Sequence, residues 1–169
     1  MMQPLRAVAC ATGVILAVVA QVAFLPWLQL PGPTPDLVLV TVVGLAIAAG
    51  PGPGTVLGLL AGVVLDVAPP ADHAIGSWAM CLCLVGYLAG LLTGPRRPRL
   101  AKYVVVAAAA ALTPLGYLLG AAALGDPRAR LADLPALLPG QVVYALLLAP
   151  AILPATAWLA RGRSRKEVP

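Results

Sequence analysis

Apolar residues in this chain form long runs, and short stretches rich in proline, glycine or charge separate one run from the next. A helix that crosses a bilayer needs about 20 consecutive apolar residues. The pattern predicts an all-α integral membrane protein with a single transmembrane domain, residues 1–160, followed by a basic tail, residues 161–169. Its six helical segments are expected at residues 5–27, 37–49, 55–68, 77–93, 103–124 and 141–160.

The second and third segments are short. Each would be about 20 Å long as a helix, whereas the hydrocarbon core of a bilayer is about 30 Å thick. We expect them either to cross with local thinning of the bilayer or to fold back as a re-entrant hairpin. Both arrangements return the chain to the same side of the membrane. The sequence GPGPG at residues 50–54 is expected to be the loop that separates them.

Prolines are expected to shape the last two segments, because a proline inside a helix removes one backbone hydrogen bond. Pro114 should kink the fifth segment, and Pro150 and Pro154 should bend the second half of the sixth. Between these two segments, residues 130–138 are expected to form a short interfacial helix.

The composition supports a membrane protein. Hydrophobic residues make up 61% of the 169 residues and charged residues only 10%, whereas soluble domains carry about 25% charged residues. A soluble monomer of this length needs more polar surface than this chain supplies. The charge content therefore excludes an ordinary soluble domain.

The positions of the basic residues predict the orientation, because basic residues in short loops mark the cytoplasmic side. With a cytoplasmic amino terminus and six spans, nine of the eleven basic residues are cytoplasmic. These nine are Arg6, Arg96, Arg97, Arg99, Lys102, Arg161, Arg163, Arg165 and Lys166. We therefore expect both termini inside. The net charge of +5 then reflects membrane orientation, and no nucleic-acid partner is expected.

A regular spacing of small residues marks the third segment. Gly54, Gly58 and Gly62 lie four residues apart, and the next step of four reaches Asp66. Small residues at this spacing form a flat stripe that lets two helix backbones approach closely in a membrane. The stripe predicts a helix–helix contact, and the opposite side of the segment, with Val56 and Leu60 among its residues, suits lipid or bulky packing.

Asp66 has two interpretations, because a carboxylate this close to the bilayer is costly unless it has a partner. It can pair with a donor on a neighbouring helix or a partner subunit. Alternatively, it is hydrated at the interface or caps the following loop by accepting backbone N–H bonds. Asp36 follows Pro35 directly before the second segment, which is a good N-cap position. His73, in the loop after Asp66, is expected to be solvated.

The sequence offers no arrangement typical of catalysis. It contains no phosphate-binding G-x-x-x-x-G-K-[ST] loop, no H-E-x-x-H motif and no Cys–His or Ser–Lys arrangement for a nucleophile or a metal. The acidic residues are dispersed, about one in each loop. We therefore expect a protein that is not an enzyme and binds neither a cofactor nor a metal.

Four features in order carry a family resemblance. Pro35-Asp36 opens a short segment, and Gly58, Gly62 and Asp66 follow in the spacing G-x-x-x-G-x-x-x-D. Ile75-Gly76 comes after a turn, and VGYLAG, which contains Tyr87, occupies residues 85–90. Over roughly residues 35–94 the chain resembles MreD, the family of small multi-span rod shape-determining proteins of bacteria. The loop VAPPADHAI after Asp66 departs from the family by being longer and richer in proline.

The resemblance implies a scaffold of the cell-wall elongation machinery in the bacterial cytoplasmic membrane. MreD-like proteins are thought to bind the bitopic protein MreC and, through it, to connect to the RodA glycan polymerase, a penicillin-binding transpeptidase and the MreB filament. Their fold is similar to the six-helix substrate-binding subunits of energy-coupling-factor transporters. Candidate residues for helix packing or partner binding are Gly54, Gly58, Gly62, Asp66, Asp36, Gly76 and Tyr87.

The same fold similarity supplies an alternative function, a small-molecule-binding subunit of a membrane transporter. Such a subunit needs an outward pocket lined by polar and aromatic side chains. The chain has one Phe and four Tyr, which is a sparse supply, although Tyr87, Tyr117 and Tyr144 are candidates to line a cavity. Among partners, membrane lipid is expected under either function.

Overall fold

The computed structural model describes residues 4–28, 34–68, 76–123 and 134–161. Within these residues the chain is helical and has no strand. The elements are α1 (Pro4–Ala23), the short 3-10 helix η1 (Leu25–Leu28), α2 (Leu37–Ala49), α3 (Pro51–Val67), α4 (Ser77–Leu92), α5 (Arg99–Ala123) and α6 (Leu134–Arg161). The expected all-α architecture with six main helices is therefore confirmed for the described part of the chain.

Three of these helices are long and apolar enough to cross a membrane. The qualifying segments are Arg6–Ala23 in α1, Arg99–Leu119 in α5 and Leu138–Ala160 in α6. The other three helices, α2, α3 and α4, are apolar but shorter. The chain therefore has the helices of a membrane protein.

Helix α3 begins at Pro51, four residues before the expected start at Thr55. The prolines of the GPGPG stretch lie in its first turn, where the backbone amides have no partner within the helix. Proline is therefore tolerated there, and its fixed φ suits the first helical position. Gly50 supplies the break from α2 with a φ of +97°, a conformation that favours glycine.

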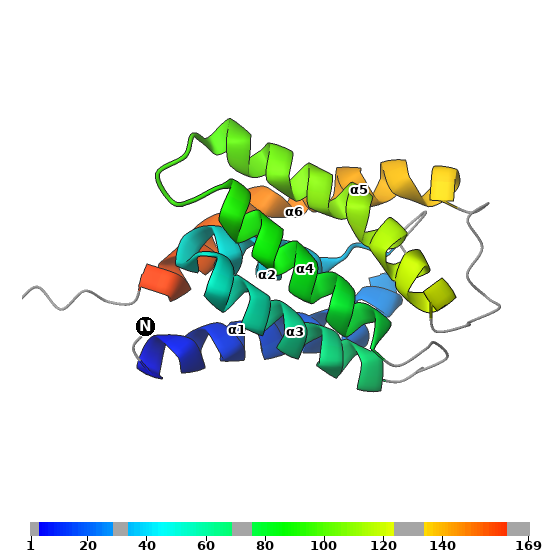
Figure 1. The fold of residues 1–169 in the computed structure, drawn as a ribbon, viewed down its shortest axis with the longest axis horizontal. Coiled ribbons are helices and arrows are strands. Elements are labelled where there is room, and N and C mark those ends of the chain that lie inside the picture. Colours follow the sequence, from blue (N-terminus) through cyan, green and yellow to red (C-terminus); the bar gives the residue numbers. More distant parts are fainter. Residues whose placement is uncertain (1–3, 29–33, 69–75, 124–133, 162–169) are drawn as a thin grey trace, which may run out of the picture.

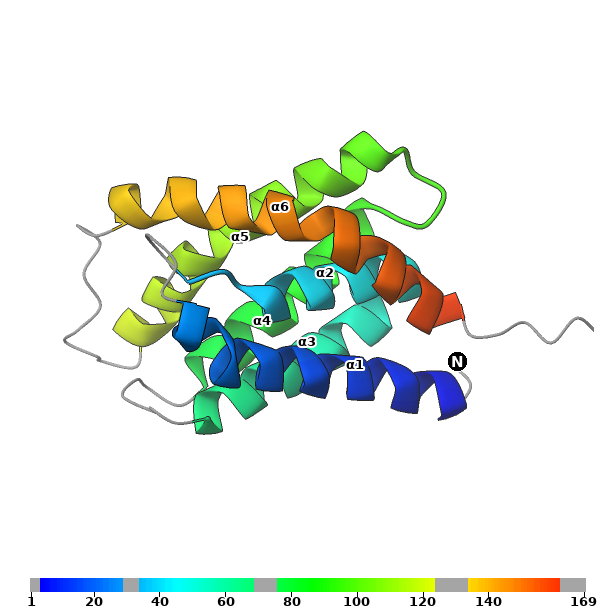
Figure 2. The same cartoon turned by 180° about the vertical axis from the view of Figure 1, so that it is seen from behind.

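Helices α5 and α6 also begin earlier than expected. Helix α5 starts at Arg99 rather than Tyr103. Helix α6 starts at Leu134 and continues through Pro139. The described part of the expected interfacial helix, residues 134–138, therefore belongs to α6. Residues 130–133 and most of the basic tail lie outside the described residues. Both helices change direction along their length (Figures 1 and 2), as their internal prolines predict.

Helix α2 forms the centre of the bundle. It contacts all five other α-helices, and ten of its thirteen residues are buried, from Val38 to Ile47. Figure 1 shows it enclosed by the longer helices. A helix that is apolar on every side is stable only where it is covered on every side, which explains why this short segment has no polar face.

The charged residues separate along the bundle axis. The start of α1, the α2–α3 turn, the α4–α5 loop and the end of α6 lie at one end of the bundle (Figure 1). Its described basic residues are Arg6, Arg96, Arg97, Arg99, Lys102 and Arg161, so we call it the basic end. The two described acidic residues, Asp36 and Asp66, lie at the other, acidic end.

The outer surface of the bundle carries many large apolar side chains. On α3 these include Val56, Leu60 and Val63, and on α4 they include Leu84 and Leu91, all of which are exposed. Comparable residues are exposed on α1, α5 and α6. An apolar exterior over most of the bundle matches a lipid environment and is rare on soluble monomers.

Candidate functional site

The glycine stripe of α3 lies directly against the backbone of α4. A Cβ atom added at Gly54 would lie 2.6 Å from the carbonyl oxygen of Gly86, and one at Gly62 would lie 2.5 Å from the backbone nitrogen of Ala79. A Cβ at Gly58 would overlap the carbonyl group of Leu82. The stripe is therefore filled by a helix of the same chain and is not available to another protein.

Helix α4 also places small residues at its contact with this stripe. A Cβ at Gly86 would overlap the carbonyl group of Gly54, and one at Gly90 would lie 2.6 Å from the Cα of Pro51. Sequence reasoning identified the α3 stripe but did not identify α4 as its partner. The available signal was the spacing of four between Gly86 and Gly90, which matches the spacing in α3.

Asp66 caps the amino terminus of α4. Its side chain is 1% exposed. One carboxylate oxygen accepts bonds from the backbone N–H groups of Gly76 and Ala79, both at 3.0 Å, and the other accepts one from Trp78 at 3.2 Å. Gly76 is the N-cap residue of α4 and has a φ of +102°, which favours glycine. Trp78 and Ala79 belong to the neighbouring helix α4, so Asp66 pairs with donors on a neighbouring helix, as the first interpretation expects, and these donors are backbone N–H groups, as the second expects.

The Asp66 cap explains why a carboxylate is tolerated in a buried position. Three backbone amides at the start of α4 have no partner within the helix, and the positive end of the helix dipole favours a negative charge there. The bonds also connect the last turn of α3 to the first turn of α4. The two helices are thus fastened at the acidic end and packed closely by glycine along their length.

Asp36 caps α2 in a more local way. Its side chain accepts a bond from the backbone N–H of Leu39 at 2.9 Å, and Gln21 of α1 accepts one from the N–H of Val38 at 2.8 Å. Asp36 is therefore the N-cap residue of α2, as expected. Burial raises the pKa of the Asp36 carboxyl, and the bond from Leu39 opposes this effect.

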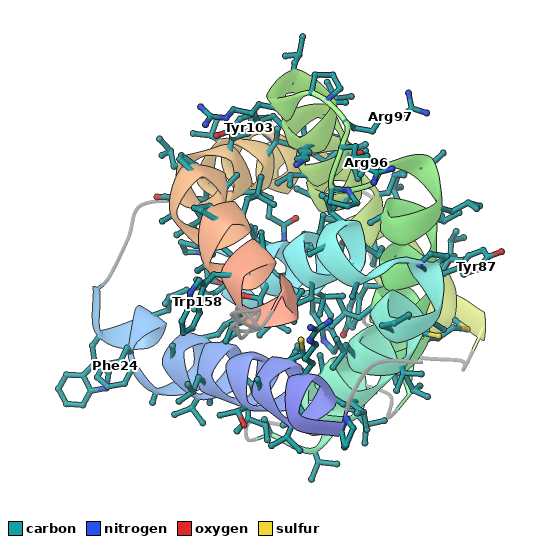
Figure 3. The ribbon with its side chains drawn as sticks, turned by 90° about the vertical axis from the view of Figure 1, so that its left-hand side faces the viewer. Phe24, Tyr87, Arg96, Arg97, Tyr103 and Trp158 are labelled. Atoms are coloured by element: carbon teal, nitrogen blue, oxygen red, sulfur yellow. The ribbon has the colours of Figure 1, made fainter. Side chains whose placement is uncertain are left out.

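The tyrosines do not gather around one cavity. Tyr87 is 44% exposed and points away from the bundle (Figure 3). Tyr117 packs against Trp78 with ring centroids 5.0 Å apart, and Tyr144 is half-buried. Among the described residues no three His, Cys, Asp or Glu side chains form a metal-binding group; His73 lies outside the described residues.

Two of the hollows on the described surface bear on function. The first, the α1–α3 groove, has a volume of about 510 Å³ and is almost wholly apolar. Its lining residues are Ala7, Val8, Ala11, Gly52, Pro53, Val56, Leu57 and Leu60. The second, the basic-end cavity, has a volume of about 450 Å³ and lies between α2, α5 and α6. Tyr87, Tyr117 and Tyr144 line neither hollow.

Comparison of the chain with known protein families, with curated proteins and with solved structures gives no match.

Proposed function

We propose that this protein is a non-enzymatic scaffold of the bacterial cell-wall elongation machinery, which maintains cell shape by binding a single-pass, MreC-like membrane protein. It works as a multi-pass protein of the cytoplasmic membrane, with both termini inside. Through its partner it connects indirectly to a RodA-type glycan polymerase, a penicillin-binding transpeptidase and an MreB filament. The sequence resemblance over residues 35–94 supports this proposal.

The observation that carries the proposal is the division of α3 into two faces. The glycine face is occupied by α4, so a partner helix has to use another surface. The α1–α3 groove is such a surface, because it is apolar and open to the lipid side of both helices. Ala7 and Ala11 lie four residues apart along it, and small residues at this spacing let a second helix approach closely.

The test is copurification of the tagged protein from native membranes in a mild detergent. We expect the wild type to recover a single-pass MreC-like protein together with wall synthases. Ala7→Leu combined with Ala11→Leu fills the groove and should abolish this recovery. Ala151→Leu with Ala155→Leu is the matched control, because both alanines are exposed on α6 at the same spacing and lie outside the groove.

One outcome would contradict the scaffold, and another would contradict only the groove as its binding surface. Recovery of an ATPase module or a bound small molecule with the wild type would instead support the transporter subunit. Equal recovery of the MreC-like partner by both double variants would remove the groove as the binding surface. Substitutions in the glycine stripe are a poorer test, because they separate α3 from α4 and so disturb the whole bundle.

A further inference from the structure

The basic-end cavity combines positive charge with apolar walls. Arg99, Lys102 and Tyr103 of α5 contribute its polar side, and Ile47 of α2 and Leu153 of α6 contribute apolar surface. Figure 3 views the molecule from this end and shows Tyr103 on the side of α5 that faces α6. Because the cavity lies at the end of the bundle, it can admit a group from the level of the lipid headgroups.

The polar side of the cavity presents hydrogen-bond donors. The Lys102 ammonium donates one bond to the carbonyl oxygen of Pro95 at 3.0 Å, which leaves two of its three N–H donors. Arg99 offers a planar guanidinium, whose paired N–H groups match the oxygens of a phosphate. Tyr103 adds a hydroxyl group. Together these groups suit an anion with several acceptor oxygens.

The backbone adds to this preference for an anion. Helix α5 begins at Arg99, so the amides of its first turn have no partner within the helix and the positive end of its dipole lies at the cavity. The described carboxylates, Asp36 and Asp66, are at the opposite end of the bundle. Within the described residues, no acidic side chain therefore lies at this end to neutralise Arg99 and Lys102.

The shape of the cavity comes from its neighbours on α2 and α6. Gly44 on α2, which lines the cavity, lies so close to Thr156 on α6 that a Cβ atom there would overlap the threonine hydroxyl. Pro150 and Pro154 line the α6 wall. Each proline lacks an amide and bends the helix, which leaves room between α6 and the start of α5.

We infer that the basic-end cavity binds the phosphate of an anionic membrane lipid, with Arg99 and Lys102 as the main ligands. The headgroup phosphate lies against α5, and the apolar walls from Ile47 and Leu153 contact the adjoining acyl region. A lipid is favoured over free phosphate because half of the cavity wall is apolar. This inference is independent of the proposed function, because it needs no protein partner.

The test is native mass spectrometry of the detergent-solubilised full chain with added phosphatidylglycerol or phosphatidylcholine. We expect the wild type to retain phosphatidylglycerol and to retain little phosphatidylcholine. Arg99→Gln with Lys102→Gln should lower phosphatidylglycerol retention at least about tenfold, since it removes both residues that donate charge-assisted hydrogen bonds to the phosphate inside the cavity. Arg99→Gln alone, which leaves the Lys102–Pro95 bond in place, should cause a smaller loss than the double variant.

The matched control is Arg96→Gln with Arg97→Gln. It removes the same charge from the adjacent loop, where both side chains are exposed and neither lines the cavity; Arg97 points away from the bundle in Figure 3. This control should retain the lipid as the wild type does. Equal losses in both double variants, or equal retention of the two lipids by the wild type, would overturn the site. Full displacement of the lipid by inorganic phosphate would show that the cavity binds free phosphate rather than a lipid headgroup.

Discussion

The two faces of α3 have opposite compositions and opposite surroundings. One face consists of Gly54, Gly58 and Gly62 and lies on the backbone of α4. The other carries Val56 and Leu60, which remain exposed and line the α1–α3 groove. In lipid, bulky apolar side chains gain little from meeting another helix, whereas small residues permit close backbone contact. In α3, glycine therefore places one face against a helix of the same chain, and the bulky face remains for lipid or another protein.

The largest effect on stability is expected where the glycine face ends, at Asp66. Replacing Asp66 with Ala removes the acceptor of three backbone N–H groups in a buried site, and each unsatisfied buried donor costs about 1–3 kcal/mol. We expect a loss of at least about 3 kcal/mol in the free energy of unfolding, measured by denaturant titration in micelles. Asp66→Asn keeps one acceptor oxygen and should recover part of this loss. Wild-type stability of Asp66→Ala would show that the cap does not fasten α3 to α4.

A smaller effect is expected from Gly58→Ala. The added methyl group would overlap the carbonyl group of Leu82, so α3 and α4 would have to separate, at a cost of about 2 kcal/mol. The matched control is Gly52→Ala on the same helix, where an added Cβ would meet nothing within 4 Å. This control should be neutral or slightly stabilising, because alanine has the higher helix propensity. Equal melting temperatures for the two variants would contradict the close packing of the glycine face.

The smallest of the three effects is expected at Asp36, whose cap is local to α2. Asp36→Ala should cost about 1 kcal/mol, the usual value for a lost N-cap, and Asp36→Asn should cost little because asparagine caps equally well. The charge of the Asp36 carboxyl also makes the stability of the fold depend on pH. Burial raises the pKa of the Asp36 carboxyl, so the folded state favours its protonated form.

The sign of this pH effect follows from proton linkage. A folded state that holds the proton more tightly is stabilised most at low pH, and it loses this contribution as pH rises from the ordinary carboxyl pKa through the raised one. As pH rises over this window, the melting temperature of the wild type should therefore fall relative to that of Asp36→Asn. A difference that stays constant would contradict the raised pKa.

Much of the fold could be predicted because it depends on local sequence. The apolar runs located all six helices, and the segment at residues 37–49 matches α2 at both ends. The first residue of α3 was missed because a proline-rich stretch was expected to be a loop, whereas prolines are accepted in the first turn of a helix. Helix α6 was expected to begin at Gln141 for a similar reason, since Pro139 was expected to lie outside it.

The candidate site was only partly predictable, because its partners are distant in sequence. The spacing of Gly58 and Gly62 predicted a helix contact without indicating which helix makes it. Neither interpretation of Asp66 identified its donors, because the positions of the Gly76, Trp78 and Ala79 amides depend on how α4 packs against α3. The basic-end cavity gave no sequence signal, because it depends on how α2, α5 and α6 pack together.

The most direct test of the scaffold is site-specific photocrosslinking in native membranes. A photoreactive amino acid at Val56 lies on the exposed face of α3 within the α1–α3 groove, whereas one at Leu84 lies on exposed α4 surface outside the groove. We expect Val56 to crosslink to a single-pass MreC-like protein and Leu84 not to crosslink to it. Capture of that protein from Leu84 but not Val56, or of a transporter ATPase module from Val56, would contradict this expectation.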